Sequence, residues 1–235
     1  MTPRVFVSPP CTPSVTLNAR QSHHLVRVLR IRAGEAVEVF DGTGRVWRAI
    51  VSKAGPGACT IERGSLVCEA APPDPQIHLA PALLRSDPMD RLLRQATELG
   101  ASRFWPLTTE RTQMARNRAE ARYDHWRRVI IGACEQSRRA HLPGLSDILR
   151  FDDFIAAVEP RQTLLLHPEA QPLHRQLQPR LTTVLVGPEG GWTDNEMDRA
   201  RDRGIGAYSL GPGILRAETA PLAAIAAIRH SWGWR

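Results

Sequence analysis

Two stretches of the chain each carry an apolar run that ends in Gly-Pro and leads toward a helix. The first is VLVGPEGGWTDNE, residues 184–196; the second, YSLGPGILRAETAPL, has its Gly-Pro at positions 211–212, 24 residues after the first. Apolar runs without alternation are typical of parallel strands covered on both faces. The loops beyond the carboxyl ends of such strands bind ligands. The two stretches therefore predict an α/β domain with a ligand site at one edge of its sheet.

The glycine spacing argues against two common phosphate-binding motifs. Neither loop has the lysine of G-x-x-x-x-G-K-[ST], and the cluster Gly187, Gly190 and Gly191 lacks G-x-G-x-x-G spacing. A nucleoside triphosphate site and a nucleotide-dependent oxidoreductase are therefore disfavoured. What remains is a ligand held by backbone polar groups and apolar walls, such as an adenosine without a phosphate chain. Two tight strand–helix turns without a ligand are the alternative that spacing leaves open.

Strands and helices alternate after residue 76. Strands are expected within residues 77–83, 102–107, 161–167, 181–187 and 204–210, and helices within 87–100 and 120–137. Thr193 and Glu196 have the spacing of a capping box at the start of another helix. In the long helix, Tyr123, Trp126, Ile130, Ala133 and Ser137 share one face, which predicts a core contact rather than an aromatic binding platform. Residues 77–235 are predicted to form an α/β domain with a mainly parallel sheet.

The first part of the chain has the pattern of β structure. Residues 36–51 alternate apolar side chains around Asp-Gly-Thr-Gly, which predicts a hairpin, and residues 4–8 and 58–67 predict further strands. A short basic helical turn is expected within residues 18–31. Residues 1–70 are therefore predicted to be a small β-barrel with one helix. The prolines of residues 71–76 predict a linker.

The charge is unevenly distributed along the chain. The net charge is +7, and 30 of the 31 basic residues are arginine. Residues 1–70 carry 9 basic and 5 acidic side chains, whereas residues 151–235 carry 9 and 10. Genome composition could explain arginine in place of lysine, but not this asymmetry. A basic first part and a neutral last part predict that one region of the chain binds a polyanion while another region has a separate role.

Several observations indicate a cytoplasmic protein. The apolar runs are too short to span a bilayer, and the first residues lack the pattern of a signal peptide. Cys11, Cys59, Cys68 and Cys134 lack metal-ligand spacing and are too few for a disulfide framework. Reduced thiols are the simplest expectation.

Both loops resemble those of a known family. LVGPEGGWTDNE followed by SLGPGILRAETA resembles the signature loops of the small-subunit (16S) rRNA uridine-N3 methyltransferases, which belong to the SPOUT superfamily of knotted methyltransferases. HHLVRVLRIRAGEAVEVFDGTG resembles that family's N-terminal PUA-like domain. MDRLLRQATELGAS and WRRVIIGACEQSRRAHLP resemble two of its further blocks. The resemblance covers nearly the whole chain in the same order.

This resemblance implies a fold and an activity. The fold would be a PUA-like RNA-binding β-barrel (1–70), a linker (71–76) and a SPOUT α/β domain with a deep trefoil knot (77–235). Because knots are nearly absent from proteins, topology rules alone would predict a plain open sheet. The activity would be methylation of N3 of one uridine in 16S rRNA near the decoding centre. The implied donor is S-adenosylmethionine without a metal, and the implied assembly is a homodimer acting on the small ribosomal subunit.

The resemblance also implies site residues. Arg216 would stabilise the negative charge that develops on the uracil oxygens. Glu218 would act as the base or orient Arg216; the alternative for Glu218 is a carboxylate that only complements a helix dipole. The cofactor-binding residues would be Leu166, His167, Pro168, Gly187, Pro188, Glu189, Gly190, Gly191, Leu210, Gly211, Gly213, Ile214, Leu215 and Thr219.

RNA contacts are expected in two places. One is a basic face of the first domain; the other is the end of the long helix, which the resemblance places near the incoming uridine. A solvated surface is the alternative for both. The residues are Arg20, His24, Arg27, Arg30, Arg32, Glu135, Gln136, Arg138 and Arg139.

The chain departs from the family pattern at four positions. Arg138 stands where a glycine is usual, Pro88 where a basic residue is usual, Gln95 where a lysine is usual, and Gly213 where an arginine is often found. These departures bear on individual RNA contacts. A non-catalytic RNA-binding assembly factor and a SPOUT enzyme for another RNA remain alternatives, and the sequence leaves open the target nucleotide, the base, and whether free RNA or a subunit is the substrate.

Overall fold

The computed structural model describes residues 2–173 and 177–233. Contacts within the chain divide it into two compact units. The first comprises Met1–Pro72 together with Cys134–Leu142, and the second comprises Pro73–Ala133 together with Pro143–Arg235. The segment Cys134–Leu142 thus belongs by its contacts to the first unit, although it includes the end of a helix that begins in the second.

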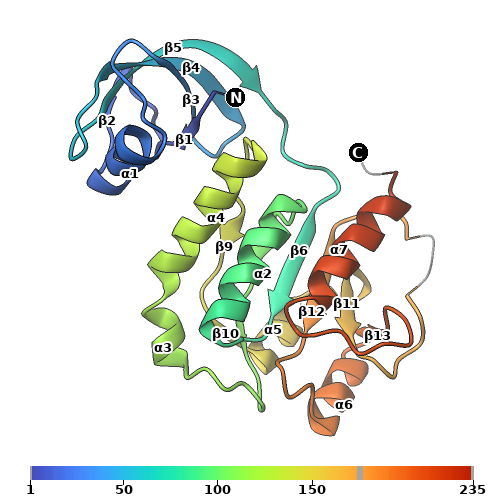
Figure 1. The fold of residues 1–235 in the computed structure, drawn as a ribbon. Coiled ribbons are helices and arrows are strands. Elements are labelled where there is room, and N and C mark those ends of the chain that lie inside the picture. Colours follow the sequence, from blue (N-terminus) through green and yellow to red (C-terminus); the bar gives the residue numbers. More distant parts are fainter. Residues whose placement is uncertain (1, 174–176, 234–235) are drawn as a thin grey trace. The chain divides into compact units, whose positions relative to one another are not determined.

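The first unit is built on a five-stranded sheet in the order β1-β3-β4-β5-β2. Strand β1 runs parallel to β3, and the other pairs are antiparallel. The predicted hairpin is confirmed, since Val39 of β3 pairs with Trp47 of β4. Figure 1 shows the sheet curving around helix α1. The strands are β1 (Arg4–Phe6), β2 (Ser14–Thr16), β3 (Ala36–Phe40), β4 (Arg45–Lys53) and β5 (Thr60–Glu69).

The core of this unit follows from the alternation of its strands. Val37 and Val39 of β3 and Trp47, Ala49 and Val51 of β4 are all buried in one apolar cluster. Because side chains alternate along a strand, the residues between them face outward. Helix α1 (Ala19–His23) continues into one π-helical turn, η1 (His24–Val28). This β-rich unit with one helical segment agrees with the sequence expectation.

The second unit contains six parallel strands in the order β13-β11-β12-β6-β7-β9. The mainly parallel sheet is thereby confirmed. The strands are β6 (Ile77–Pro81), β7 (Arg103–Phe104), β9 (Gly144–Leu145), β11 (Thr163–Leu166), β12 (Thr182–Val186) and β13 (Gly206–Tyr208).

One predicted strand is divided. Residues 102–107 form β7 and then β8 (Leu107–Thr108), and β8 pairs with β10 (Leu149–Arg150) in a separate two-stranded sheet. Pro106 lies between the two pieces and has no N–H to donate, so the ladder is interrupted there.

Helices cover the large sheet on both faces. Helix α7 (Ala220–Ser231) packs on β6, β12 and α2 (Ser86–Glu98). Apolar side chains of α5 (Phe151–Ala157) and α6 (Asp194–Asp202) pack with Leu165 and Leu185. The remaining helical segments are α3 (Arg116–Glu120), α4 (Tyr123–Ser137) and η2 (Pro160–Gln162). Buried apolar residues on both faces explain why the strand sequences lack alternation.

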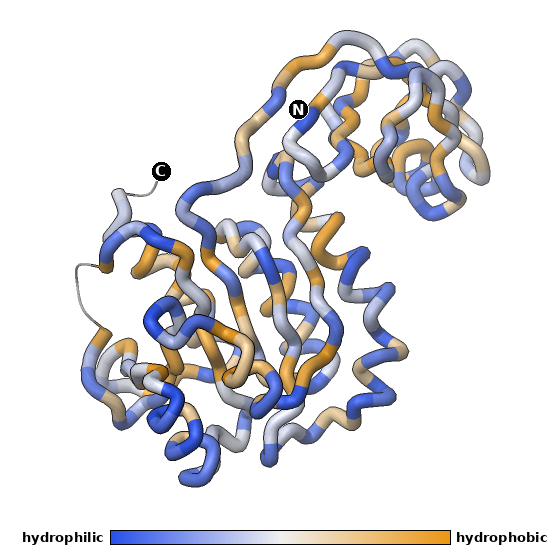
Figure 2. The backbone as a smooth tube through the Cα atoms, turned by 180° about the vertical axis from the view of Figure 1, so that it is seen from behind, coloured by the Kyte–Doolittle hydropathy of each residue, from blue (hydrophilic) through white to orange (hydrophobic). Residues whose placement is uncertain are grey.

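Helix α4 is amphipathic. Figure 2 shows hydrophobic and hydrophilic residues alternating along it. Trp126, Ile130 and Ala133 are buried, as the helical stripe predicts. The stripe therefore contributes to the core.

Three strand ends meet at one edge of the sheet. Leu166, the last residue of β11, is in register with Val186 of β12 and with Tyr208 of β13. Beyond the strands, Ser209 exchanges backbone hydrogen bonds with Gln171 and Leu173. The segments that follow β11 and β13 therefore run side by side. This arrangement brings both Gly-Pro loops and residues 167–168 to the same place.

Candidate active site

A cavity of about 1220 Å³ lies at this edge of the sheet. Its walls come from the loops after β11, β12 and β13 and from the first turns of α2. The predicted residues that line it are Leu166, His167, Pro168, Gly187, Pro188, Glu189, Gly191, Leu210, Gly211, Gly213, Ile214, Leu215, Arg216 and Glu218. Gly190 and Thr219 are not among the lining residues. The carbonyl of Gly190 instead accepts a hydrogen bond from Arg111, and Thr219 is the N-cap residue of α7.

The two Gly-Pro loops approach the cavity with their backbones. Gly211 has φ +132°, a conformation that side-chain-bearing residues rarely adopt, and a Cβ added there would meet nothing within 4 Å. At Gly187 an added Cβ would lie 3.1 Å from the ring of Trp192, so a side chain would crowd that tryptophan. The loops therefore offer main-chain polar groups to a ligand, while Leu166, Val186 and Leu210 supply apolar wall.

Trp192 joins the first loop to the end of β11. Its side chain is buried, its Nε1 donates to the Leu166 carbonyl at 3.1 Å, and its ring lies 5.2 Å from that of Phe151. One side chain thus ties the loop after β12 to the neighbouring strand end.

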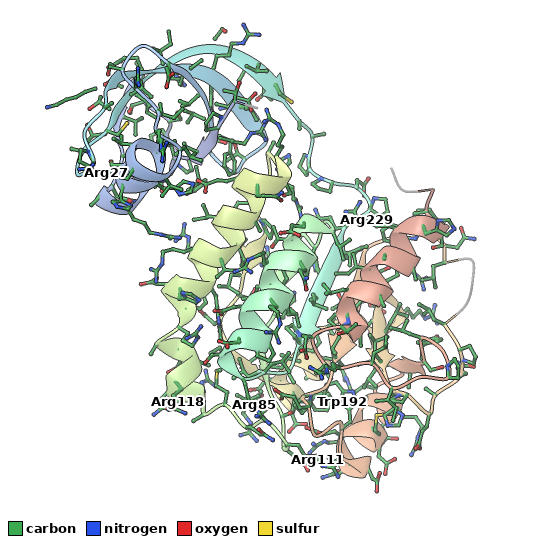
Figure 3. All side chains as sticks on the ribbon, in the orientation of Figure 1. Arg27, Arg85, Arg111, Arg118, Trp192 and Arg229 are labelled. Carbon is green, nitrogen blue, oxygen red and sulfur yellow. The ribbon has the colours of Figure 1, made fainter. Side chains whose placement is uncertain are left out.

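Arg111 and a capping box hold the same loop from the other side. The Arg111 guanidinium donates to the Gly190 carbonyl at 2.9 Å and to the Trp192 carbonyl at 3.1 Å. The predicted capping box of Thr193 and Glu196 is confirmed, and the buried Glu196 carboxylate also accepts from the Glu110 N–H at 2.9 Å. Figure 3 shows Arg85, Arg111 and Trp192 near the start of α2. The loop conformation is therefore set before any ligand arrives.

His167 lines the cavity and is held from two sides. Its Nδ1 accepts from the Glu169 N–H at 3.2 Å, and its backbone N–H donates to the Tyr208 carbonyl at 3.0 Å. These contacts fix the residue at the end of β11.

Arg216 and Glu218 both line the cavity but do not form an ion pair with each other. Arg216 is exposed, and its carbonyl accepts from the N–H groups of Thr219 and Ala220. The Glu218 carboxylate lies 3.2 Å from the Arg91 guanidinium. The partner of Glu218 is therefore on α2, which does not support an orienting contact between Glu218 and Arg216.

Sequence reasoning missed the contribution of α2. Arg85, Ser86, Asp87 and Arg91 also line the cavity. The Arg85 N–H donates to Glu189 Oε1 at 3.2 Å, which links α2 to the first loop. The sequence contained part of the information needed to predict this contribution, because β6 is another strand that is followed by a helix. Only the pairing of β6 with β12 places its carboxyl end beside the loops.

The basic residues predicted for RNA contact in the first domain are exposed. Arg27 belongs to the π-helical turn η1, and Arg30 just after it has φ +60°, a left-handed conformation that is uncommon for non-glycine residues. Both π-turns and such φ values are frequent at functional sites. The full set lies within residues 20–32: Arg20, His24, Arg27, Arg30 and Arg32.

The residues predicted for RNA contact at the end of α4 differ in their surroundings. The Glu135 carboxylate accepts from the Phe6 N–H at 3.0 Å, and burial raises its pKa. Arg138 donates to the Glu38 carboxylate at 2.6 Å, and Arg4 donates to the same carboxylate and to the Arg138 carbonyl.

These contacts hold the segment Cys134–Leu142 in the first unit. They give Glu135 and Arg138 a structural role that sequence reasoning did not anticipate. Of the other two residues predicted there, Gln136 is exposed and Arg139 is half-buried.

The described residues lack the features of two other kinds of protein. Within residues 2–173 and 177–233, no group of three or more His, Cys, Asp or Glu side chains could hold a metal ion. No helix in this part of the chain is long and apolar enough to cross a membrane.

Comparison with known families identifies the class. Residues 72–229 match the RNA methyltransferase domain family, and residues 17–62 match the RNA methyltransferase PUA domain family. The chain thus combines the two domains of an RNA methyltransferase with a PUA domain. Among individual relatives, the ribosomal RNA small subunit methyltransferase E of Synechocystis is 38% identical over 223 residues, covering 92% of this chain and 72% of the relative. The chain belongs to the ribosomal RNA small subunit methyltransferase E family.

Solved structures agree with this assignment. The ribosomal RNA small subunit methyltransferase E of Neisseria gonorrhoeae, solved with bound S-adenosyl methionine, is 30% identical with a TM-score of 0.86, and 98% of each chain is covered. A methyltransferase structure from Legionella pneumophila, in complex with the cofactor SAM, is 28% identical with a TM-score of 0.90 and the same coverage.

Proposed function

We propose that this protein transfers the methyl group of S-adenosylmethionine to N3 of one uridine in 16S rRNA, near the decoding centre of the small subunit, and that it acts as a homodimer. The observation that carries the proposal is the meeting of three strand ends in one cavity with exposed glycine backbone and apolar walls. The similarity to methyltransferases solved with this donor supports it. The deep knot remains part of the proposal, and the side-by-side path of the segments after β11 and β13 is compatible with it.

The cavity suits such a donor in three respects. Its volume of about 1220 Å³ is ample for a nucleoside-sized ligand. Gly211 allows the main chain to approach closely, and Leu166 and Leu210 offer apolar contact for an adenine ring. When bound, the donor supplies an electrophilic methyl group.

The protein's own residues have two tasks in this reaction. The first is alignment of donor and uridine, which can contribute roughly 7–11 kcal/mol of barrier reduction. The second is handling of the N3 proton, because the neutral imide nitrogen is a poor nucleophile. We assign Glu218, whose side chain is 13% exposed in the cavity wall, as the base. We assign Arg216 as the donor of hydrogen bonds to the uracil oxygens as negative charge develops on them.

Methyl transfer to isolated subunits tests the proposal directly. Small ribosomal subunits that lack the modification should incorporate one labelled methyl group each, and mapping should place it on N3 of a single uridine. Calorimetry with a chelator present should show one S-adenosylmethionine site per protomer. Label on another position or another RNA would contradict the substrate assignment, and loss of donor binding with the chelator would contradict the metal-free site. Light scattering should give twice the protomer mass.

The exposed arginines of the first unit should contribute affinity rather than chemistry. Replacing Arg27 and Arg30 together by glutamine should weaken rRNA binding. It should also reduce the slope of log K, the binding constant, against log salt concentration by about 1.4–1.8, because each lost phosphate contact removes about 0.7–0.9 from that slope. Donor binding should not change. The matched control is Arg45→Gln, since the Arg45 guanidinium is already paired with Glu69 at 2.7 Å. An unaltered salt slope in the double variant would show that these arginines do not meet phosphate.

A further inference from the structure

Two successive residues attach α2 to two different parts of the second unit. The Asp90 carboxylate accepts from Arg122 at 2.8 Å and lies 2.6 Å from His125 Nε2. The next residue, Arg91, contacts Glu218 in the segment that precedes α7. The helix is thus fixed beside the start of α4 and, through one guanidinium, holds the end of the second Gly-Pro loop.

That loop end has few other anchors. Ile214 and Leu215 are 85% and 39% exposed. A Cβ built on Gly213 would meet nothing within 4 Å. The Arg216 carbonyl accepts from the N–H groups of Thr219 and Ala220, which follow in the same stretch of chain. The Glu218 side chain, by contrast, is only 13% exposed and is paired. In the described part of the chain, the ion pair of Arg91 and Glu218 is the polar side-chain contact that joins residues 213–219 to α2.

We propose that Arg91 is a positioning residue: by holding Glu218 it fixes the backbone at Arg216, two residues earlier, and so aims the Arg216 guanidinium at the substrate. The proposal rests on the function proposed above. A half-exposed ion pair contributes too little to decide folding. A displacement of about 1 Å at a reacting group, however, can cost up to about 10²-fold in rate. The consequence of losing Arg91 should therefore appear in turnover, not in stability.

The kinetic test compares two arginines of the same helix. Arg91→Ala should lower kcat about 10- to 100-fold, with KM for the subunit close to that of Arg94→Ala. Arg94 is exposed, forms no ion pair with the described residues, and carries the same charge, so Arg94→Ala controls for loss of charge near the RNA. Arg91→Lys should recover part of kcat, because an ammonium can still pair with Glu218.

Hydrogen exchange supplies a measurement that needs no ligand and no activity. The amides of Thr219 and Ala220 donate to the Arg216 carbonyl, and in Arg91→Ala they should exchange faster than in the wild type or in Arg94→Ala. If the wild type fails to methylate subunits, the proposed function is wrong. Hydrogen exchange then still decides whether the ion pair of Arg91 and Glu218 orders the loop. If the wild type is active but Arg91→Ala matches Arg94→Ala in both kcat and exchange, the positioning role is wrong.

Discussion

Replacing Arg216 by alanine should lower the rate of methyl transfer about 10²–10³-fold, the usual consequence of removing one preorganised donor to a developing anion. Donor affinity should stay nearly intact, because the second Gly-Pro loop meets the cavity with its main chain at Gly211. The Arg216 side chain is exposed and forms no ion pair with the described residues, so its removal should not disturb the fold. Arg216→Lys should recover little, since a point charge cannot replace the planar fork of a guanidinium.

The measurement pairs donor titration with single-turnover methylation of subunits. Arg91→Lys is a useful companion, because it alters the neighbouring ion pair while leaving the Arg216 guanidinium in place. If Arg216→Ala methylates at the wild-type rate, or loses donor affinity and rate in parallel, the assignment of Arg216 to the developing charge is wrong.

Replacing Trp192 by alanine should lower the free energy of unfolding by about 3–5 kcal/mol, as for other large-to-small substitutions of buried aromatic residues. It should also weaken donor binding, because Trp192 ties the first Gly-Pro loop to the end of β11 through its ring and its Nε1. Trp192→Phe separates these contributions. It keeps most of the ring but leaves the Leu166 carbonyl without its partner, which costs about 1–3 kcal/mol.

Denaturant unfolding and donor calorimetry check this prediction together. Trp105 supplies the matched control: it is half-buried in the same unit, its ring lies 6.2 Å from that of Phe154, and it does not line the cavity. Trp105→Ala should destabilise the protein while leaving the intrinsic donor affinity close to that of the wild type. Equal loss of donor affinity in both variants would mean that Trp192 acts only through global stability.

Much of the architecture followed from the sequence because it depends on local chemistry. The hairpin around Asp41 and Gly42, the capping box of Thr193 and Glu196, and the buried stripe of α4 each involve residues close in the chain, and each is confirmed. The two Gly-Pro loops also predicted a site at the carboxyl edge of a parallel sheet. That rule needs only the order of strands and helices, not the identity of their neighbours.

The tertiary structure decided which distant residues join that site. Arg85 and Arg91 reach the cavity because β6 pairs with β12 across about a hundred positions of sequence. Pairing at such separation depends on the packing of the whole sheet, which no local pattern encodes. The same holds for Glu135 and Arg138, whose partners Phe6 and Glu38 lie in the first strands of the chain. The sequence determined the loops and their chemistry, whereas the tertiary fold determined which charged side chains meet there, because long-range strand order sets those contacts.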